Sequence, residues 1–165
     1  MLKDLFTQRL YIQLSPERVL MRDPKSNKSV DEVPEIAVQR PVGGKAVIVA
    51  VGAEARSAAA QPDTTVHNPF AHPRSLVSDF TLAEHVLKGF VQRLRGNRLL
   101  LPSPVIVIHP LGEHAGGLTQ VEVRALQELA LGAGASSVKV WQGPALTDDQ
   151  LLSGDLPASG KVLNV

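Results

Sequence analysis

The hydrophobic and polar positions of this chain divide it into a strand-rich first part and a second part in which helices alternate with strands. In the first part, short apolar runs predict four strands, at residues 9–14, 18–22, 35–40 and 46–51. The first two should pair as a hairpin, because Ser15-Pro16-Glu17 between them is a turn sequence. Residues 53–60 are strong helix formers and predict a short helix. Two polar, turn-rich stretches, at residues 23–33 and 61–74, predict loops.

The second part contains two predicted amphipathic helices. The first begins at Thr81 and ends at Gly96-Asn97, and its apolar residues recur at the helical period: Leu82, Val86, Leu87, Phe90, Val91 and Leu94. The second covers residues 119–131. Both begin with the spacing of a capping box, Thr81 with Glu84 and Thr119 with Glu122, which satisfies free N–H groups at a helix start.

Strands are expected between and after these helices. The unbroken apolar run at residues 104–109 is typical of a strand buried on both faces. Further strands are predicted at residues 137–142 and 162–165, with a short helix at 147–152 between them. This order predicts an α/β fold with a mixed sheet, in which an antiparallel hairpin leads into βαβ crossovers.

Composition narrows the class of protein. A chain of 165 residues suits one domain with a real core. The 17 basic and 16 acidic residues nearly cancel and form no basic stripe, so nucleic acid is not an expected partner. The absence of cysteine excludes disulfides and thiolate chemistry. No apolar run is long enough to span a bilayer, and the N-terminus lacks the apolar core of a signal peptide, so we expect a cytoplasmic protein.

The segment 118–144, LTQVEVRALQELALGAGASSVKVWQGP, is the most informative stretch of the sequence. It reads as a helix, a glycine corner and a strand, and it resembles a signature of the MreB family of bacterial actin-like proteins. That family has V-E-R-R-A, a helix ending A-L-x-A-G-A, and a strand closed by E-E-P. Residues 77–81 (VSDFT) and 104–110 (PVIVIHP) resemble two further family motifs in the same order.

The resemblance implies a fold. It predicts that residues 1–165 form a single actin-like lobe, domain I of an actin-like ATPase, with a ribonuclease-H-like mixed sheet and flanking helices. Residues 23–74 would then resemble a reduced subdomain IB. The chain is too short for both lobes of a complete actin-like molecule.

The phosphate-binding loops of the family are not recognisable here. The first hairpin of the family carries D-L-G-T-x-N-T, whose glycine lets backbone amides close on a phosphate. This chain has Gln13, Ser15 and Pro16 in that place, so a metal-binding carboxylate is missing, a Cβ is added and a donor N–H is removed. The second loop, D-I-G-G-G-T-T, is expected beyond Val165. We therefore predict no nucleotide or other cofactor and no metal.

Glu122 matches the glutamate of V-E-R-R-A, which the resemblance implies would position the attacking water of an ATPase. The same residue is the third helical position of the Thr119 capping box. A lone carboxylate without a phosphate site has nothing to hydrolyse, so the sequence favours the cap as its role.

Other candidate chemistry is weaker. His109, Glu113 and His114 could suggest zinc, but the spacing does not place both imidazoles on one helical face. Asp79 and His85 with a nearby serine, Ser75 or Ser78, lack a nucleophile signature. Gly132-Ala133-Gly134 ends a helix, whereas a dinucleotide fingerprint begins one. The N-terminal residues 1–6 are only weakly amphipathic, so membrane contact through them is not expected.

The sequence therefore predicts a non-catalytic actin-like half-domain, a binding or structural protein related to the bacterial cell-shape cytoskeleton. Its expected partner is a second copy or a full-length actin-like protein, with Val162–Val165 in the interface because an unpaired sheet edge invites pairing. One alternative is a residual nucleotide-binding or ATPase lobe that uses Glu122 and is completed by a partner chain. Another is a fragment of a longer protein without a separate role.

Overall fold

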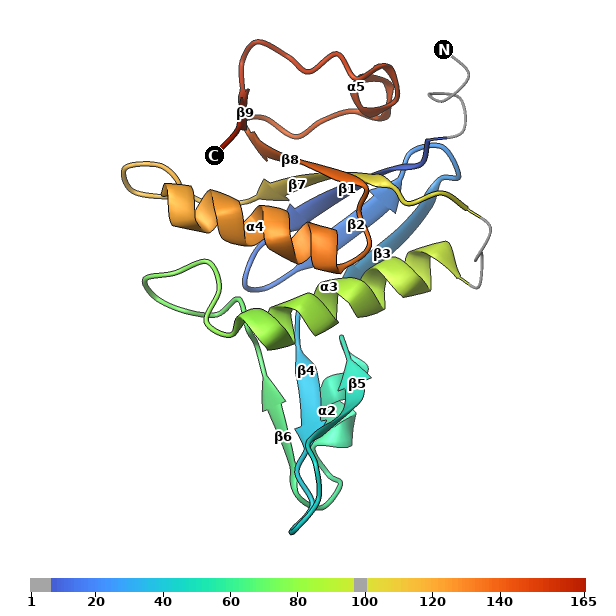
Figure 1. Cartoon of the computed structure of the whole chain (residues 1–165), viewed down its shortest axis with the longest axis vertical. Helices are drawn as coiled ribbons and strands as arrows, with labels where there is room; N and C mark the ends of the chain where they lie inside the picture. The colour runs from blue at the N-terminus through green and yellow to red at the C-terminus, as the bar shows by residue number, and fades with distance from the viewer. Residues whose placement is uncertain (1–6, 97–100) are drawn as a thin grey trace.

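The computed structural model describes residues 7–96 and 101–165. Among these residues, six strands form the main sheet in the order β3-β2-β1-β7-β8-β9 (Figure 1). The β1–β2–β3 meander and the β8–β9 pair are antiparallel, while β1, β7 and β8 run parallel. The strands are β1 Arg9–Leu14, β2 Val19–Asp23, β3 Lys28–Glu32, β7 Val105–Pro110, β8 Ser137–Gln142 and β9 Lys161–Leu163. The mixed α/β sheet predicted from the sequence is confirmed.

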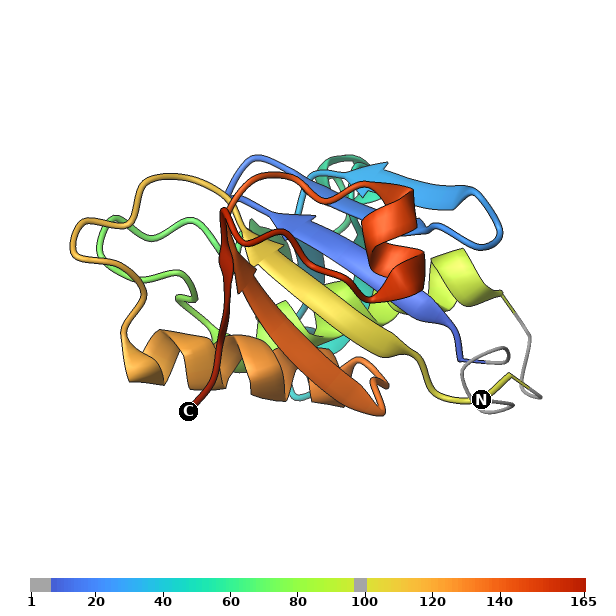
Figure 2. The same cartoon turned by 90° about the horizontal axis from the view of Figure 1, so that it is seen from above.

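Two long helices cover one face of this sheet, and a short helix lies on the other (Figures 1 and 2). These are α3 Phe80–Arg95 and α4 Gln120–Gly132 on the first face, and α5 Asp148–Ser153 on the second. The sheet separates two cores, because successive side chains along each strand point to opposite faces. Leu10 and Ile12 pack beneath α3 and α4, whereas Tyr11 packs with Trp141 and Leu151 beneath α5.

A second, three-stranded sheet extends beyond α3, away from the main sheet (Figure 1). Its order is β5-β4-β6, and both pairs are antiparallel. A short helix packs on it through Ala55 and Ala58, which meet Ala37 of the sheet. These small residues allow close approach but bury little apolar area. The elements are β4 Ile36–Gln39, β5 Val47–Val51, β6 Thr64–His67 and α2 Glu54–Ala58.

Two stretches predicted as loops contain strands, so those predictions were wrong. Residues 23–33 include β3, and residues 61–74 include β6. Each is an edge strand with a single apolar residue facing a core, Val30 in β3 and Val66 in β6. Such strands carry almost no alternation signal, and pairing with a neighbouring strand decides their conformation.

The predicted capping box at the start of α3 was also wrong. The N-cap is Asp79, which is extended and accepts a hydrogen bond from Leu82 N at 2.9 Å. Thr81 therefore lies inside the first turn. An aspartate is as good a cap as threonine, and here it stands before the first helical residue, Phe80. Gly96 ends the helix as predicted; Asn97 lies outside the described residues.

Long polar side chains and a tryptophan hold the segment after β8 on the sheet. Arg9 donates to the carbonyls of Leu151 and Leu152 at the end of α5. Arg22 donates to the carbonyl of Leu146, and its Nη1 lies 3.3 Å from Oδ1 of Asp148. Trp141 Nε1 donates to the Pro144 carbonyl at 2.8 Å, which turns the chain directly after β8.

None of the helices in the described part of the chain is long and apolar enough to cross a bilayer.

The packing around Trp141 generates a stability prediction. A Cβ at Gly160 would lie 2.3 Å from the indole ring, so Gly160→Ala must displace the ring or β9. We expect it to lower the free energy of unfolding by about 1–3 kcal/mol, the usual cost of overpacking. Gly89→Ala, within α3, is the matched control. Its Cβ would meet Val51 at 3.7 Å, an ordinary contact, so this substitution should raise the free energy of unfolding by about 0.5–1 kcal/mol. Urea unfolding of both variants measures the contrast, and equal stabilities would contradict it.

Candidate functional site

The carboxyl ends of the parallel strands meet at one edge of the main sheet. In the β1–β7 pair, Leu14 lies opposite Pro110, and Leu111 N continues the pairing by donating to the Leu14 carbonyl at 2.7 Å. Open α/β sheets bind ligands at this edge. The loops after β1 and β7 and the connection before α3 enclose a groove of about 540 Å³ there. The side chains that line it include Pro16, Phe70, His72, Arg74, His114, Thr119 and Glu122.

The turn after β1 is closed by its own hydrogen bonds. Ser15 N donates to the Arg18 carbonyl at 2.9 Å, and Arg18 N donates to Ser15 Oγ at 3.1 Å. Pro16 has no N–H, so Glu17 alone among these four residues has an amide free of these bonds. A phosphate cradle needs several convergent backbone amides. This turn cannot supply them without opening.

The connection before α3 fixes this turn from outside. Asn68 Nδ2 donates to the Pro16 carbonyl at 2.7 Å, and Asn68 Oδ1 accepts from Phe70 N at 3.0 Å. Phe70 is buried in the main core. The sequence did not reveal this contact, because it joins two loops far apart along the chain and an isolated asparagine in a loop carries no pattern.

Glu122 lies in the groove at the start of α4 and closes the capping box. Thr119 N donates to Glu122 Oε2 at 2.9 Å, and Glu122 N donates to Thr119 Oγ1 at 3.2 Å. The backbone hydrogen bond from Thr119 is the main cause that lowers the pKa of Glu122, against the opposing effect of burial. The carboxylate is thus ionised and already held by its own helix. Of the residues singled out from the sequence, Pro16, Ser75, Glu113, His114 and Glu122 line this groove. Gln13 and Ser15 are not among its lining residues.

The two histidines considered as metal ligands have different surroundings. His109 is 5% exposed, and its Nδ1 lies 2.6 Å from the hydroxyl of Tyr11, which also accepts from Leu146 N. Burial lowers the pKa of His109, and a hydrogen bond with the backbone of Gly143 works against that shift. His114 lies in the loop after β7 and lines the groove. Within residues 7–96 and 101–165, no cluster of three or more His, Cys, Asp or Glu side chains could hold a metal ion.

Comparison with known proteins identifies the family. The profile of the MreB/Mbl protein family matches residues 14–147. The chain belongs to the MreB/Mbl family. It is 30% identical over 145 residues to the cell shape-determining protein MreB of Haemophilus influenzae, and 27% identical over 144 residues to that of Escherichia coli K12. These alignments cover 87% and 86% of the chain but 40% of each relative, so this chain spans about 40% of their length.

Solved structures agree on the fold. MreB5 of Spiroplasma citri bound to ADP matches 80% of this chain with a TM-score of 0.60 at 18% identity, over 37% of its own length. A non-polymerising MamK mutant bound to AMPPNP matches 81% of this chain with a TM-score of 0.63 at 15% identity, over 40% of its own length. The fold of this MreB/Mbl chain is therefore the actin-like α/β lobe, a mixed sheet with flanking helices.

The capping box allows the role of Glu122 to be tested. Glutamine also serves in a capping box, so Glu122→Gln should change the free energy of unfolding by only a few tenths of a kcal/mol. Thr119→Ala removes the oxygen that accepts from Glu122 N and should cost about 1 kcal/mol. Thermal and urea unfolding measure both. A large loss of stability in Glu122→Gln would contradict the cap.

The buried histidine predicts a pH dependence. The pKa of His109 is depressed in the folded protein, so the unfolded chain takes up the proton first as pH falls below about 6.5. Stability should be fully present above that pH and should decline as pH falls towards the folded pKa. His109→Gln cannot bind this proton, so its stability should fall less between pH 7 and pH 5. Urea unfolding at several pH values compares the two slopes, and identical slopes would contradict the prediction.

Proposed function

We propose that this MreB/Mbl chain is a non-catalytic actin-like lobe that acts in the bacterial cytoplasm as a binding or structural protein of the cell-shape cytoskeleton. The single observation that carries the proposal is the turn after β1. The amides of Ser15 and Arg18 are bonded across the turn and Pro16 has none, so Glu17 alone offers a free N–H there. Glu17 adds a negative charge where a phosphate would lie.

The state of Glu122 supports the same proposal. A residue that orients water needs a carboxylate free to accept from that water. Here Glu122 Oε2 accepts from both N and Oγ1 of Thr119, at 2.9 Å each. These bonds stabilise the helix start, which is the role that the capping box gives this carboxylate.

One observation favours the alternative of a residual nucleotide-binding lobe. Glu122 lines a groove of about 540 Å³ at the sheet edge where α/β proteins bind ligands. Under this alternative a partner chain would complete the site and supply the phosphate contacts. The closed turn makes this the weaker proposal.

The proposal also includes the domain organisation of the chain. We treat residues 1–165 as one actin-like lobe and residues 23–74 as a reduced counterpart of subdomain IB. The small sheet and α2 within that range support this view, since they project from the main sheet as one separate unit (Figure 1). The proposed partner is a second copy of the chain or a full-length actin-like protein, and nucleic acid is not a proposed partner.

Calorimetry with ATP and Mg²⁺ tests the function directly. We expect no saturable heat at millimolar nucleotide, because the turn after β1 offers no amide cradle. Spiroplasma citri MreB5, which has been solved with AMPPNP, is the positive control under the same conditions. Inorganic phosphate controls for non-specific anion binding.

Two outcomes of this titration would decide against the proposal. Saturable binding of ATP but not of phosphate would show that a nucleotide site exists. If Glu122→Gln then reduced turnover of that nucleotide without changing the melting temperature, the chain would be a residual ATPase that uses Glu122.

A further inference from the structure

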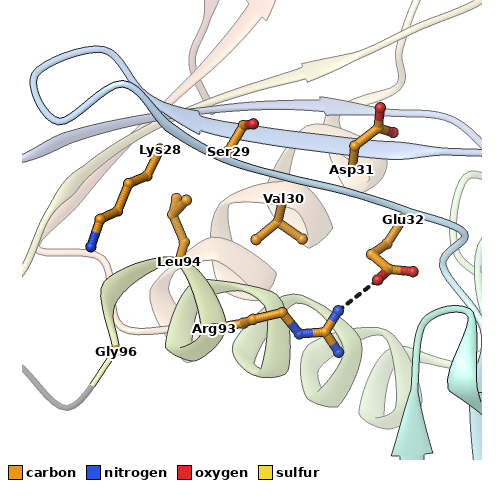
Figure 3. A pocket seen from close by; sticks show the side chains of 8 residues that line it. All are labelled: Lys28, Ser29, Val30, Asp31, Glu32, Arg93, Leu94 and Gly96. Atoms are coloured by element: carbon orange, nitrogen blue, oxygen red, sulfur yellow. Dashed lines mark hydrogen bonds and ion pairs between the residues drawn. The ribbon is translucent and has the colours of Figure 1, made fainter.

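β3 forms one edge of the main sheet, and within the described part of the chain no strand pairs with its outer side. A groove of about 490 Å³ runs beside it, between β3 and the end of α3 (Figure 3). Val30 and Leu94 form its apolar floor, with Lys28 towards one end and the Glu32–Arg93 ion pair towards the other. An open strand edge of this kind offers unpaired N–H and C=O groups to another extended chain.

The side chains of β3 are divided by hydrogen-bonding character. Lys28 and Ser29 come first and are donors, and the structure assigns neither side chain a hydrogen bond or ion pair within the described residues. Asp31 and Glu32 come last and are acceptors. Lys28, Val30 and Glu32 point towards α3, while Ser29 and Asp31 point to the opposite face (Figure 3). Each face of the strand therefore has a donor at its start and an acceptor at its end.

Both acceptors are held in place by contacts within the chain. Asp31 accepts from Nε and Nη2 of Arg18 at 2.6 and 2.5 Å. Glu32 Oε1 accepts from Arg93 Nη1 at 2.7 Å, and Oε2 accepts from Ala53 N at 2.8 Å. Each carboxylate oxygen keeps further acceptor capacity. The two carboxylates are thus oriented in advance and can still accept from a second partner.

We propose that a second copy of this chain pairs antiparallel with β3 about a two-fold axis at Val30. The axis places Val30 opposite Val30 of the partner subunit, and Lys28 opposite Glu32 of the partner subunit. On the other face, Ser29 lies opposite Asp31 of the partner subunit. Every free donor meets a fixed carboxylate, and the two-fold repeats each contact.

Other arrangements of the same edge lose this match. A parallel pairing in register brings each carboxylate beside its own copy, and like charges on neighbouring strands destabilise a sheet. A shift by two residues takes Val30 away from its equivalent and leaves both Lys28–Glu32 pairs unmade. The charge order of β3 therefore selects one orientation and one register.

The position of α3 is compatible with this pairing. α3 packs on both β2 and β3, so a two-fold axis normal to the sheet sets the two α3 helices side by side. With a strand spacing of about 4.8 Å, they are about 10 Å apart, the separation of packed helices. The opposite edge is less suited, because β9 has three residues, Lys161–Leu163, and no acidic side chain. The proposed interface therefore lies at β3, in place of the residues 162–165 expected from the sequence.

Charge reversal on this edge is the first test, by sedimentation equilibrium of the full chain over a concentration series. Lys28→Glu turns two attractive pairs into two repulsive ones and should weaken dimerisation about tenfold or more. Lys28→Arg should dimerise as the wild type does. Lys45→Glu and Lys161→Glu make the same change of net charge on the β4–β5 loop and on β9, and should leave the dissociation constant unchanged.

Cross-linking is the second test, because the chain has no cysteine of its own. Antiparallel partners directly opposite each other have Cα atoms about 4.5–5.5 Å apart, within the range of a disulfide. Val30→Cys should therefore form a covalent dimer under mild oxidation, and Val162→Cys on β9 should not.

The inference rests on the proposed function of a protein-binding lobe, but different results would contradict the interface and the function. A strictly monomeric mass at all concentrations, or a dimer weakened by Lys161→Glu and cross-linked through Val162→Cys, overturns the β3 interface. Capture of an unrelated extended peptide by a monomeric chain also overturns it. Saturable ATP binding by the Lys28→Glu variant overturns the proposed function and leaves the interface intact.

Discussion

The parallel pairing of β1 with β7 is the contact on which the rest of the structure depends. It joins the N-terminal hairpin to a strand far along the chain and aligns Leu14 with Pro110. That alignment brings the turn after β1 and the loop after β7 to the same sheet edge, where they form the groove. The alternation along β1 also divides the molecule, because Ile12 enters the core beneath α3 and α4 while Tyr11 enters the core beneath α5. A one-residue slip of this pair would exchange the two cores.

Much of this fold could be predicted from the sequence, where local patterns are strong. The apolar run of β7 and the helical period of α3 each specify one element, and the α4 capping box lies within four residues. β3 and β6 could not be predicted, because each contributes one apolar residue and takes its conformation from a neighbouring strand. The Asp79 cap was missed for a different reason. Two acceptable caps stand two residues apart, and tertiary packing of α3 decides which of them begins the helix.

The candidate site also has one part that the sequence predicts and another part that it does not. The contact between Thr119 and Glu122 is local, so its residue types and spacing were sufficient to predict it. The groove is assembled from three segments that meet only in the folded chain, so its shape left no local signal. The bond from Asn68 to the Pro16 carbonyl depends on that assembly, and the Tyr11–His109–Leu146 contacts also join residues far apart along the chain. The same contacts bury His109 of β7, whereas His114 lies in the loop after that strand.

The closed turn after β1 makes the proposed lack of catalysis difficult to reverse. Replacing Pro16 would restore one N–H, but Ser15 N and Arg18 N would still bond across the turn. Replacing Ser15 by glycine would free Arg18 N from the hydroxyl and permit close approach of a phosphate, yet Gln13 would still lack the charge for a metal. Each change alone leaves the site incomplete, because a phosphate needs several donors and a counter-ion together. The groove remains, but what the chain presents to other molecules is its surface and strand edges, and the β3 edge carries the most specific arrangement of charge.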